Sequence, residues 1–453
     1  MNIIVAGCGS VGTALIKQLV KEDHNITVID SEPAKVKEVV DTYDVMGIAG
    51  NAASYSIMKE AGIEEANLMI AVTNFDELNL LCCLIANKAG DCRTVARVRN
   101  PVYKQEVEYI KEELGLSMVI NPEEAAAGEA MRLLKFPSAK RVESFARGRV
   151  EMVTIVIDEN SPLVGKTLIN IRQRLKANVL FSVVSRKDEV IIPDGSFIPE
   201  KDDEITLIGI TGQMMDFFRA IKVRSSRVHS AMIVGGGSVS FYLAQQLLSM
   251  GVDVRIFEAG KTRAKELSML LPEALIINGS GVDKDMLMEE GLEGVEAFAA
   301  FTERDEENIM LSMHANTVSK AKRITLVHHV HYNELIGTLN VGSVIDIREI
   351  TAHIISQFVR GMSNSMGSDI EALYPINDGK AEVLEFLIKE SAPIAGIRLA
   401  DMNIKKGVLV ASIIRKNTAI SPSGNTKIKA GDRLIIVTTL SGFDECSDIL
   451  DDR

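Results

Sequence analysis

The sequence is poor in the features that mark secreted, membrane-spanning or nucleic-acid-binding proteins. It has 5 cysteines in 453 residues, and none of them stands in a Cys-x-x-Cys pattern. A disulfide framework and a structural zinc site are therefore not expected. No basic segment precedes the first apolar run, and no stretch approaches about 18 consecutive apolar residues, which argues against a signal peptide and a transmembrane helix. We expect a soluble protein of the reducing cytoplasm.

Positive charge is also scarce. Lysine and arginine together number 50 and aspartate and glutamate 62, so the formal net charge is −12. Because a general nucleic-acid binder presents a basic face to the phosphates, this balance argues against nucleic acid as a partner. The 46% hydrophobic and 25% charged residues are those of an ordinary globular protein, and the length suggests two or three domains.

The chain contains an internal duplication. Residues 3–19 (IIVAGCGSVGTALIKQL) reappear in altered form at 232–248 (MIVGGGSVSFYLAQQLL), and residues 161–168 (SPLVGKTL) reappear at 392–399 (APIAGIRL). Ordered matches at a nearly constant offset indicate two copies of a two-part unit. We expect N-lobes at 1–125 and 228–345, smaller C-lobes at 150–222 and 372–453, and segments of hinge helix and linker at 126–149 and 346–371.

The two kinds of lobe have different patterns. In the N-lobes, short apolar runs alternate with amphipathic stretches, which predicts a parallel sheet with helices on both faces, as in a Rossmann-like α/β fold. The C-lobes are shorter. Their period-two runs at 152–157, 179–184, 189–192 and 205–210, with one short helix near 167–174, predict a small α+β unit.

A glycine-rich turn follows the first predicted strand. It consists of Gly7, Cys8, Gly9, Ser10, Val11 and Gly12. Gly7 permits a tight turn, Gly9 lets a phosphate approach the backbone, and Gly12 lets helix and strand pack closely. The exposed amides and the helix dipole then hold an anion. Asp30, at the end of the second strand, would accept hydrogen bonds from ribose hydroxyls; it disfavours NADP but does not separate NAD from ATP or ADP.

The second N-lobe has an altered version of this turn. Its residues are Gly235, Gly236, Gly237, Ser238, Val239 and Ser240, followed at the next strand end by Glu258. Ser240 replaces the third glycine, and Glu258 is one methylene longer than Asp30. A weaker or empty site is a real alternative here, and a nucleotide-free layer that kept its glycines for packing is an alternative in both lobes.

Further polar residues follow the other strands, whose carboxyl ends meet at one edge of a parallel sheet. The candidates for contact with adenine, ribose or phosphate are Asn51, Thr73, Asn74, Arg97, Asn278 and Gly279. Arg99 shares a strand face with Arg97, but a solvated surface position explains it equally well. The histidines at 328, 329 and 331 come with no completing carboxylate or cysteine, so no metal is expected.

No catalytic set accompanies the glycine turns. The C-lobes are small and poor in histidine, cysteine and paired acids, so they are unsuited to serve as the catalytic domain of a dehydrogenase. Two nucleotide-binding layers without a catalytic partner favour a sensor, in which ligand binding biases the orientation of lobes. The competing interpretation is an NAD-dependent oxidoreductase with a Rossmann domain.

The combination of motifs resembles the TrkA family of tandem RCK (KTN) proteins. The resemblance rests on GCGSVG (7–12), GNAAS (50–54), AVTNFDELN (71–79), VARVRNP (95–101) and the SPLVGKTL element, and it covers nearly the whole chain. It implies RCK C-terminal (TrkA-C) lobes and a non-enzymatic, cytoplasmic regulator, peripheral on the inner face of the cell membrane, of a TrkH- or TrkG-type potassium-translocating subunit. It also implies a tetrameric gating ring and a response to NAD(H) and to ATP or ADP.

Residues of the family's nucleotide site carry over by position. In the first N-lobe they are Gly7 through Val11, Asp30, Thr73, Asn74 and Arg97, and in the second N-lobe Glu258. The departure at Ser240 leaves the ligand of the second lobe open.

Overall fold

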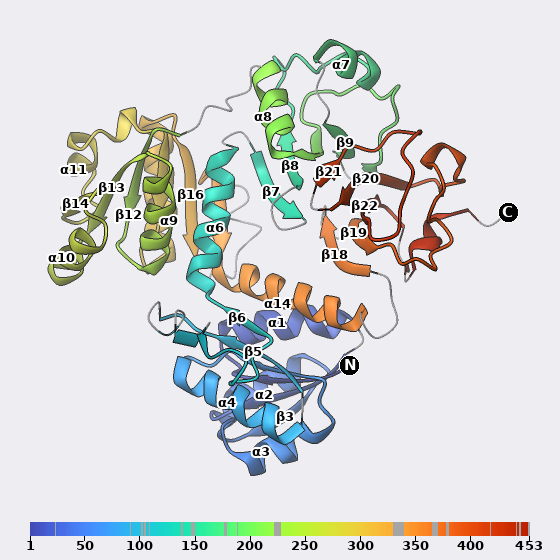
Figure 1. Cartoon of the computed structure of the whole chain (residues 1–453). Helices are drawn as coiled ribbons and strands as arrows, with labels where there is room; N and C mark the ends of the chain where they lie inside the picture. Colours follow the sequence, from blue (N-terminus) through green and yellow to red (C-terminus); the bar gives the residue numbers. More distant parts are fainter. Residues whose placement is uncertain are drawn as a thin grey trace. The chain divides into compact units, whose positions relative to one another are not determined.

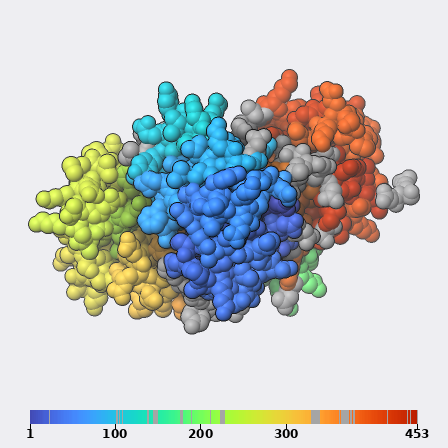
Figure 2. Space-filling model, turned by 90° about the horizontal axis from the view of Figure 1, so that it is seen from below, coloured from blue at the N-terminus to red at the C-terminus, as the bar shows by residue number. Residues whose placement is uncertain are grey.

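Short, almost wholly buried runs form the sheet of the first N-lobe. The computed structural model describes the whole chain except residues 23, 91, 101, 102, 104, 105, 108, 137, 138, 146–149, 176–178, 188, 222–227, 329–338, 365–369, 377–379, 417, 441, 444, 452 and 453. In strand β1 (Asn2–Ala6) and strand β4 (Leu68–Ala71), nearly every residue is buried, because helices cover both faces of the sheet. The lobe is blue to cyan in Figures 1 and 2.

The strands of this lobe pair in parallel in the order β3-β2-β1-β4-β5-β6. The remaining elements are α1 (Ser10–Leu19), β2 (Asn25–Asp30), α2 (Pro33–Thr42), β3 (Met46–Ala49), α3 (Tyr55–Glu60), α4 (Asp76–Gly90), β5 (Arg93–Arg97), β6 (Met118–Ile120) and α6 (Pro122–Lys135). The strand order reverses between β1 and β4. In open α/β sheets, ligands bind outside the carboxyl ends of the strands at such a reversal, so this edge is where a site is expected.

The second N-lobe repeats this topology, with the strand order β14-β13-β12-β15-β16-β17. Its elements are β12 (Ser230–Val234), α9 (Ser238–Ser249), β13 (Asp253–Glu258), α10 (Lys261–Leu270), β14 (Leu275–Asn278), α11 (Lys284–Glu289), β15 (Ala297–Ala300), α12 (Asp305–Val318), β16 (Lys322–Val327), β17 (Ser343–Asp346) and α14 (Ile347–Asn364). The predicted Rossmann-like fold of both N-lobes is thereby confirmed.

The two N-lobes, with the beginnings of α6 and α14, form one of two compact units, Met1–Met131 with Val228–Ser356. Within this unit the helix that closes each lobe reaches the glycine-turn helix of the other. Asn121, at the start of α6, donates to the hydroxyl of Tyr242 on α9 at 3.2 Å. Gln18 on α1 donates to Glu349 on α14 at 3.2 Å and accepts from Ser356 at 3.0 Å.

The C-lobes form the other unit, Arg132–Arg227 with Gln357–Arg453. The first C-lobe contains β7 (Ala139–Phe145), β8 (Val150–Val156), α7 (Leu168–Leu175), β9 (Leu180–Arg186), β10 (Glu189–Ile191), β11 (Glu204–Ile210) and α8 (Thr211–Ala220). The second contains β18 (Ile370–Ile376), β19 (Ala381–Leu387), β20 (Val408–Arg415), β21 (Thr418–Ile420) and β22 (Arg433–Thr438), with short 3-10 turns at Leu399–Asp401 and Cys446–Ile449.

Each C-lobe has an antiparallel five-stranded sheet, in the orders β10-β9-β11-β8-β7 and β18-β19-β22-β20-β21. One buried apolar cluster takes side chains from both sheets, among them Met152 and Val183 from the first C-lobe and Val383 and Ile435 from the second. The two C-lobes therefore share a core, which a sequence-based division into separate lobes does not predict.

The segments predicted as hinge helix and linker hold more structure than expected. Residues 126–149 contain the rest of α6 and strand β7, and residues 346–371 contain α14 and the beginning of β18. The strand β7 pairs with β8, and β18 with β19, so each of these strands extends a C-lobe sheet. The sequence did not predict β7 as a strand, because its charged residues interrupt the apolar alternation that is typical of strands.

The two C-lobes differ where their sequences match best. Helix α7 follows the SPLVGKTL element, whereas only a 3-10 turn follows its counterpart at 392–399. In the second C-lobe the amide of Lys405 donates to the carbonyl of Ile449 at 2.9 Å, and Ile404 pairs with Leu450. Residues 404 and 405 thus pair with residues 449 and 450 and do not continue the 3-10 turn as a helix.

Candidate functional site

The glycine turn of the first N-lobe has the local geometry that its sequence predicts. Gly7 has a φ of +106°, and a side chain there would press on the backbone of Val72 and Thr73. A side chain at Gly12 would collide with the carbonyl oxygen of Gly7. A side chain at Gly9, in contrast, would meet nothing within 4 Å. Gly7 and Gly12 are therefore required by packing, and Gly9 borders open space above the turn.

The helix that follows this turn begins without a cap. Gly9 is the N-cap residue of α1, with extended backbone, and no side chain accepts a hydrogen bond from the first amides of the helix. Gly237 is the uncapped N-cap of α9 in the same way. Amides at an uncapped helix start, aided by the helix dipole, form a site for an anion such as phosphate. Other helices, such as α2 and α10, also begin without a side-chain cap, so it is the glycine turn together with the uncapped start that marks the site.

Asp30 lies beside the turn at the end of β2. Its carboxylate accepts a hydrogen bond from the amide of Cys8 at 2.7 Å and another from the amide of Glu32 at 2.9 Å. These bonds fix the carboxylate at the position where a Rossmann-like site holds the ribose. A carboxylate has more lone-pair sites than these two amides use, so it can still accept from ribose hydroxyls.

Glu258 does the same in the second N-lobe, in spite of its greater length. Its two oxygens accept from the amides of Gly236 at 2.8 Å and Gly260 at 2.5 Å. Arg263 on α10 donates from Nε to the carbonyl of Gly236 at 2.8 Å. Ser240 is fully buried, and its hydroxyl has no hydrogen-bond partner among the residues that the structure describes. The second turn is therefore formed, with an arginine beside it and a serine packed in place of the third glycine.

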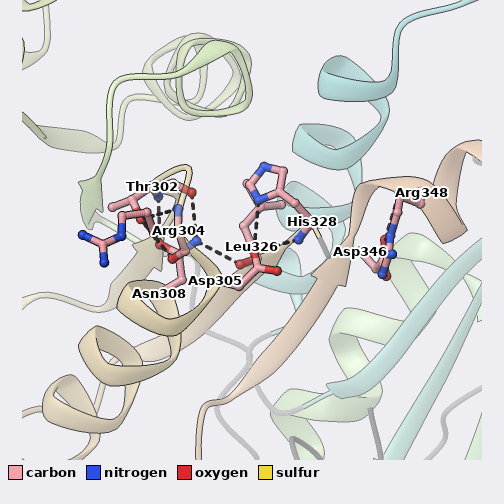
Figure 3. A network of polar contacts seen from close by, with 8 residues as sticks. All are labelled: Thr302, Arg304, Asp305, Asn308, Leu326, His328, Asp346 and Arg348. Atoms are coloured by element: carbon pink, nitrogen blue, oxygen red, sulfur yellow. Dashed lines mark hydrogen bonds and ion pairs between the residues drawn. The ribbon is translucent and has the colours of Figure 1, made fainter. Parts of the chain in front are cut away.

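An asparagine on the next helix organises the strand ends beside each turn. The side-chain oxygen of Asn79 accepts from the amide and hydroxyl of Thr73, and its side-chain nitrogen donates to the carbonyls of Thr73 and Arg97. Asn308 makes the same four bonds to Thr302 and Leu326 (Figure 3). The sequence shows Asn79 and Asn308 as a matched pair, which was the available signal, but not their role.

Arg97 is the unusual residue of this edge. It is 9% exposed, and the only hydrogen bond of its guanidinium within the described chain goes from Nη1 to the carbonyl of Thr73, at 3.5 Å. Its Nε is buried and has no partner among the described residues. Burial, and then the nearby charge of Arg99, lower the pKa of Arg97. Arg99 itself is half-exposed and pairs with Glu123 at 2.6 Å, so its role is local.

Most of the remaining predicted site residues make hydrogen bonds that stabilise the loops in which they lie. Asn51 is exposed, and its side-chain oxygen accepts from the amide of Ala53 at 3.0 Å. Asn278 donates to the carbonyls of Glu258 and Ala259, and the amide of Gly279 also donates to Glu258. Asn74 is exposed beyond the end of β4. These residues lie at or just beyond the carboxyl ends of the strands, and their protein contacts are those of turn formation.

Of the three neighbouring histidines at 328, 329 and 331, the structure describes only His328. His328 follows β16, and its amide and Nδ1 both contact Asp305, at 2.8 and 3.1 Å (Figure 3). His329 and His331 lie outside the described residues. Among the residues that the structure describes, no group of three or more histidine, cysteine, aspartate or glutamate side chains is placed to hold a metal ion.

The thiol of Cys8, in the glycine turn, is expected to be unreactive. All five cysteines are buried, and none forms a disulfide. Burial, followed by the charge of Asp30, raises the pKa of the Cys8 thiol to about 12, and burial raises that of Cys82 to about 12. Because the thiolate is the reactive form, we expect a thiol reagent at pH 8 to modify less than one cysteine per native chain in minutes and all five in denaturant. Rapid labelling of Cys8 in the native protein would contradict the placement of the turn.

With this geometry in view, the comparison with known proteins is decisive. The TrkA-N domain model matches residues 3–122 and 231–347, and the TrkA-C domain model matches 152–222 and 383–451. The chain is 31% identical to Trk system potassium uptake protein TrkA homolog 1 of Methanosarcina mazei, over 98% of this chain and 99% of that protein. This chain belongs to the TrkA family.

Other relatives agree. Trk system potassium uptake protein TrkA of Haemophilus influenzae is 29% identical over 96% of this chain and 95% of its own length. A solved structure described as "GsuK channel bound to NAD" shares the fold, with a TM-score of 0.62 and 16% identity over 96% of this chain and 76% of that one. The predicted family and the tandem order of TrkA-N and TrkA-C domains are confirmed. No helix within the described part of this TrkA-family chain is long and apolar enough to cross a membrane.

Proposed function

We propose that this chain is a nucleotide-binding regulatory subunit of a Trk-type potassium-uptake system. It binds NAD(H) or ATP and ADP at the glycine turns, lies at the cytoplasmic face of the membrane, and assembles as a ring on a TrkH- or TrkG-type translocating subunit. The observation that carries the proposal is the uncapped start of α1 with Asp30 held beside it, repeated at α9 with Glu258. The names of the full-length relatives supply the transport system.

The regulatory role follows from what surrounds the turns. The closing helices α6 and α14 contact the helices α9 and α1, which begin at the glycine turns. A ligand that tightens one turn therefore acts on the helix that leads from the other N-lobe into a C-lobe. Such a contact lets a nucleotide change the balance between two arrangements of the ring, as gating requires.

The alternative, an NAD-dependent oxidoreductase, needs a general acid or base beside the nucleotide. The carboxylates that are almost fully buried in the described part of the C-lobes are instead in ion pairs: Asp203 with Arg186, Asp432 with Arg415, Glu151 with Lys135 and Glu385 with Arg433. Buried carboxylates in such pairs hold a fold together and are poor proton carriers. We therefore propose that the chain catalyses no redox reaction.

The test is a titration of the full chain with NADH, ATP and ADP, with and without the substitution Asp30→Ala. We expect this change to weaken nucleotide binding at the first N-lobe about tenfold or more, since it removes a charged acceptor for two hydroxyls. Asp41→Ala, an exposed position on α2 of the same lobe, is the matched control and should bind as the wild type does.

The regulatory part of the proposal has its own measurement. Potassium flux through a Trk-type translocating subunit in liposomes should change with nucleotide only when this chain is added, and Asp30→Ala should blunt the response. Absence of any association with the membrane subunit, under every nucleotide, would contradict the regulator. Turnover of NADH with a metabolite would support the oxidoreductase instead.

A further inference from the structure

The first C-lobe contains a cavity of about 610 Å³. It lies between the end of β8, the loop at 158–166 and the helices α7 and α8, which are labelled in Figure 1. Its volume is in the range of sites that bind small molecules. The lining residues all belong to this one lobe, so the cavity does not depend on how the N-lobe unit and the C-lobe unit are arranged.

The floor of the cavity is aliphatic. The side chains of Ile157, Leu163, Ile171 and Ile221 line it, and each of these residues is almost fully buried. No aromatic side chain is found among the described lining residues. Proteins commonly hold a nucleobase by stacking it on aromatic side chains, so this lining favours a flexible aliphatic chain over a base. An aliphatic chain gains by leaving water for such a surface.

The polar part of the lining has an excess of positive charge, with two cations and one carboxylate. Lys166 donates from Nζ to the carbonyl of Pro162 at 2.5 Å, which keeps its ammonium group in the loop. Arg174 on α7 is exposed and makes no hydrogen bond or ion pair within the described chain. The carboxylate of Asp158 accepts from the amide of Asn160 at 2.8 Å and so belongs to a turn. The guanidinium of Arg174 is therefore available to a ligand.

The second C-lobe shows the corresponding place closed by the chain itself. There the amide of Lys405 donates to the carbonyl of Ile449 at 2.9 Å, and Ile404 pairs with Leu450. In the alignment of the two halves, these positions correspond to α7 and to the end of α8. The apolar side chains around this pairing belong to one buried cluster. The first copy thus has a cavity where the second has packed side chains.

We propose that the cavity of the first C-lobe binds an aliphatic carboxylate of medium chain length. Its chain lies on the aliphatic floor, and its carboxylate pairs with Arg174, whose planar fork of donors matches a carboxylate. Such a ligand links α7 to the end of α8, as the main chain links the equivalent segments of the second C-lobe. This site is separate from the glycine turns, so the inference adds a second class of effector and does not depend on nucleotide binding.

The test is a calorimetric titration of the full-length chain with hexanoate, octanoate and decanoate, below their critical micelle concentrations. We expect the affinity to rise about threefold for each added methylene, because each one buries further apolar surface. Arg174→Gln should weaken decanoate binding about tenfold and leave the binding of uncharged decanol unchanged. Arg172→Gln is the matched control, since Arg172 is exposed on the same helix and lies outside the lining. It should bind decanoate as the wild type does.

A second variant places the chain of the ligand. Val156 lines the cavity and is half-exposed, so Val156→Asp should fold, and its carboxylate should weaken decanoate binding about tenfold or more by repelling the ligand. Ile198→Asp is the control for this change, because Ile198 is also half-exposed in the first C-lobe and lies outside the lining. Thermal unfolding of each variant shows that any loss is not one of folding.

The outcomes decide the inference independently of the proposed function. Affinity that does not change with chain length, or an equal loss in Arg172→Gln and Arg174→Gln, would overturn it as adsorption to the surface. Undiminished binding by Val156→Asp would place the ligand outside the cavity and overturn it as well. If decanoate does not bind, this inference fails and the nucleotide proposal stands. If nucleotides do not bind but decanoate binds as expected, only the nucleotide proposal fails.

Discussion

Replacing Gly9 by aspartate is expected to weaken nucleotide binding at the first N-lobe strongly and to leave the lobe folded. Gly9 has a φ of −73° and a ψ of −172°, which an ordinary residue adopts, and a side chain there has nothing within 4 Å. Aspartate is also a favoured N-cap, worth roughly a few tenths of a kcal/mol relative to glycine. The carboxylate would occupy the phosphate position and repel the phosphate of the nucleotide. We therefore expect a loss of affinity of roughly a hundredfold, which corresponds to about 2.7 kcal/mol. Titration with ATP and NADH checks the affinity.

The controls for this prediction come from the neighbouring glycines and from the repeat. Gly9→Ala should fold and bind more weakly than the wild type, because it adds bulk and no charge. Gly7→Asp should fold poorly, since φ is +106° at Gly7 and its side chain would press on Val72 and Thr73. Gly237→Asp should abolish binding at the second lobe only. Undiminished binding by Gly9→Asp, with the lobe folded, would place the ligand somewhere other than the start of α1.

Sequence reasoning predicted the features that local rules determine. The glycine turn, the acidic residue after β2 and the α/β alternation each follow from short segments, and the duplication lent each segment a second example. Strand β6 was not predicted because it is only three residues long, and β7 was not predicted because charged residues interrupt its alternation. Strand β6 forms by pairing with β5, which lies well before it in the chain, and β7 is an edge strand, so neither has a clear local apolar pattern.

The environment of Arg97 could not be predicted from the sequence, for a different reason. The sequence placed Arg97 and Arg99 on one strand face and favoured Arg97 as the site residue, but it did not show what surrounds either side chain. The structure separates them: Glu123 pairs with Arg99, and Arg97 lies beneath the end of β4. The replacement of Arg97 by Leu326 in the repeat was visible in the alignment of the two halves, but its meaning depends on Asn79 and Asn308, which hold the two strand ends alike.

In the C-lobes, Asp203→Asn and Asp432→Asn are each expected to lower the free energy of unfolding by about 3 kcal/mol. Asp203 and Asp432 are each 1% exposed, and each receives two hydrogen bonds, at 2.7 to 2.8 Å, from Arg186 and Arg415 respectively. Each also accepts backbone amides, of Glu200 and of Lys429. Replacing the charge with an amide removes the buried counter-ion of the arginine, although Arg186 keeps an ion pair with the exposed Glu200. It also turns an acceptor into a donor that faces other donors.

The expected readout follows from the shared core of the C-lobes. Because Met152 and Val183 pack in one cluster with Val383 and Ile435, either substitution should lower the same thermal transition. At temperatures below that transition, both variants should still bind nucleotide, because the N-lobes form a separate unit. Asp401→Asn is the matched control: its pair with Arg398 is half-exposed and lies within one turn, so the change should stay within about 0.5 kcal/mol. Two separate transitions, each lowered by only one of the buried substitutions, would mean that the C-lobes unfold independently and that the shared cluster contributes little.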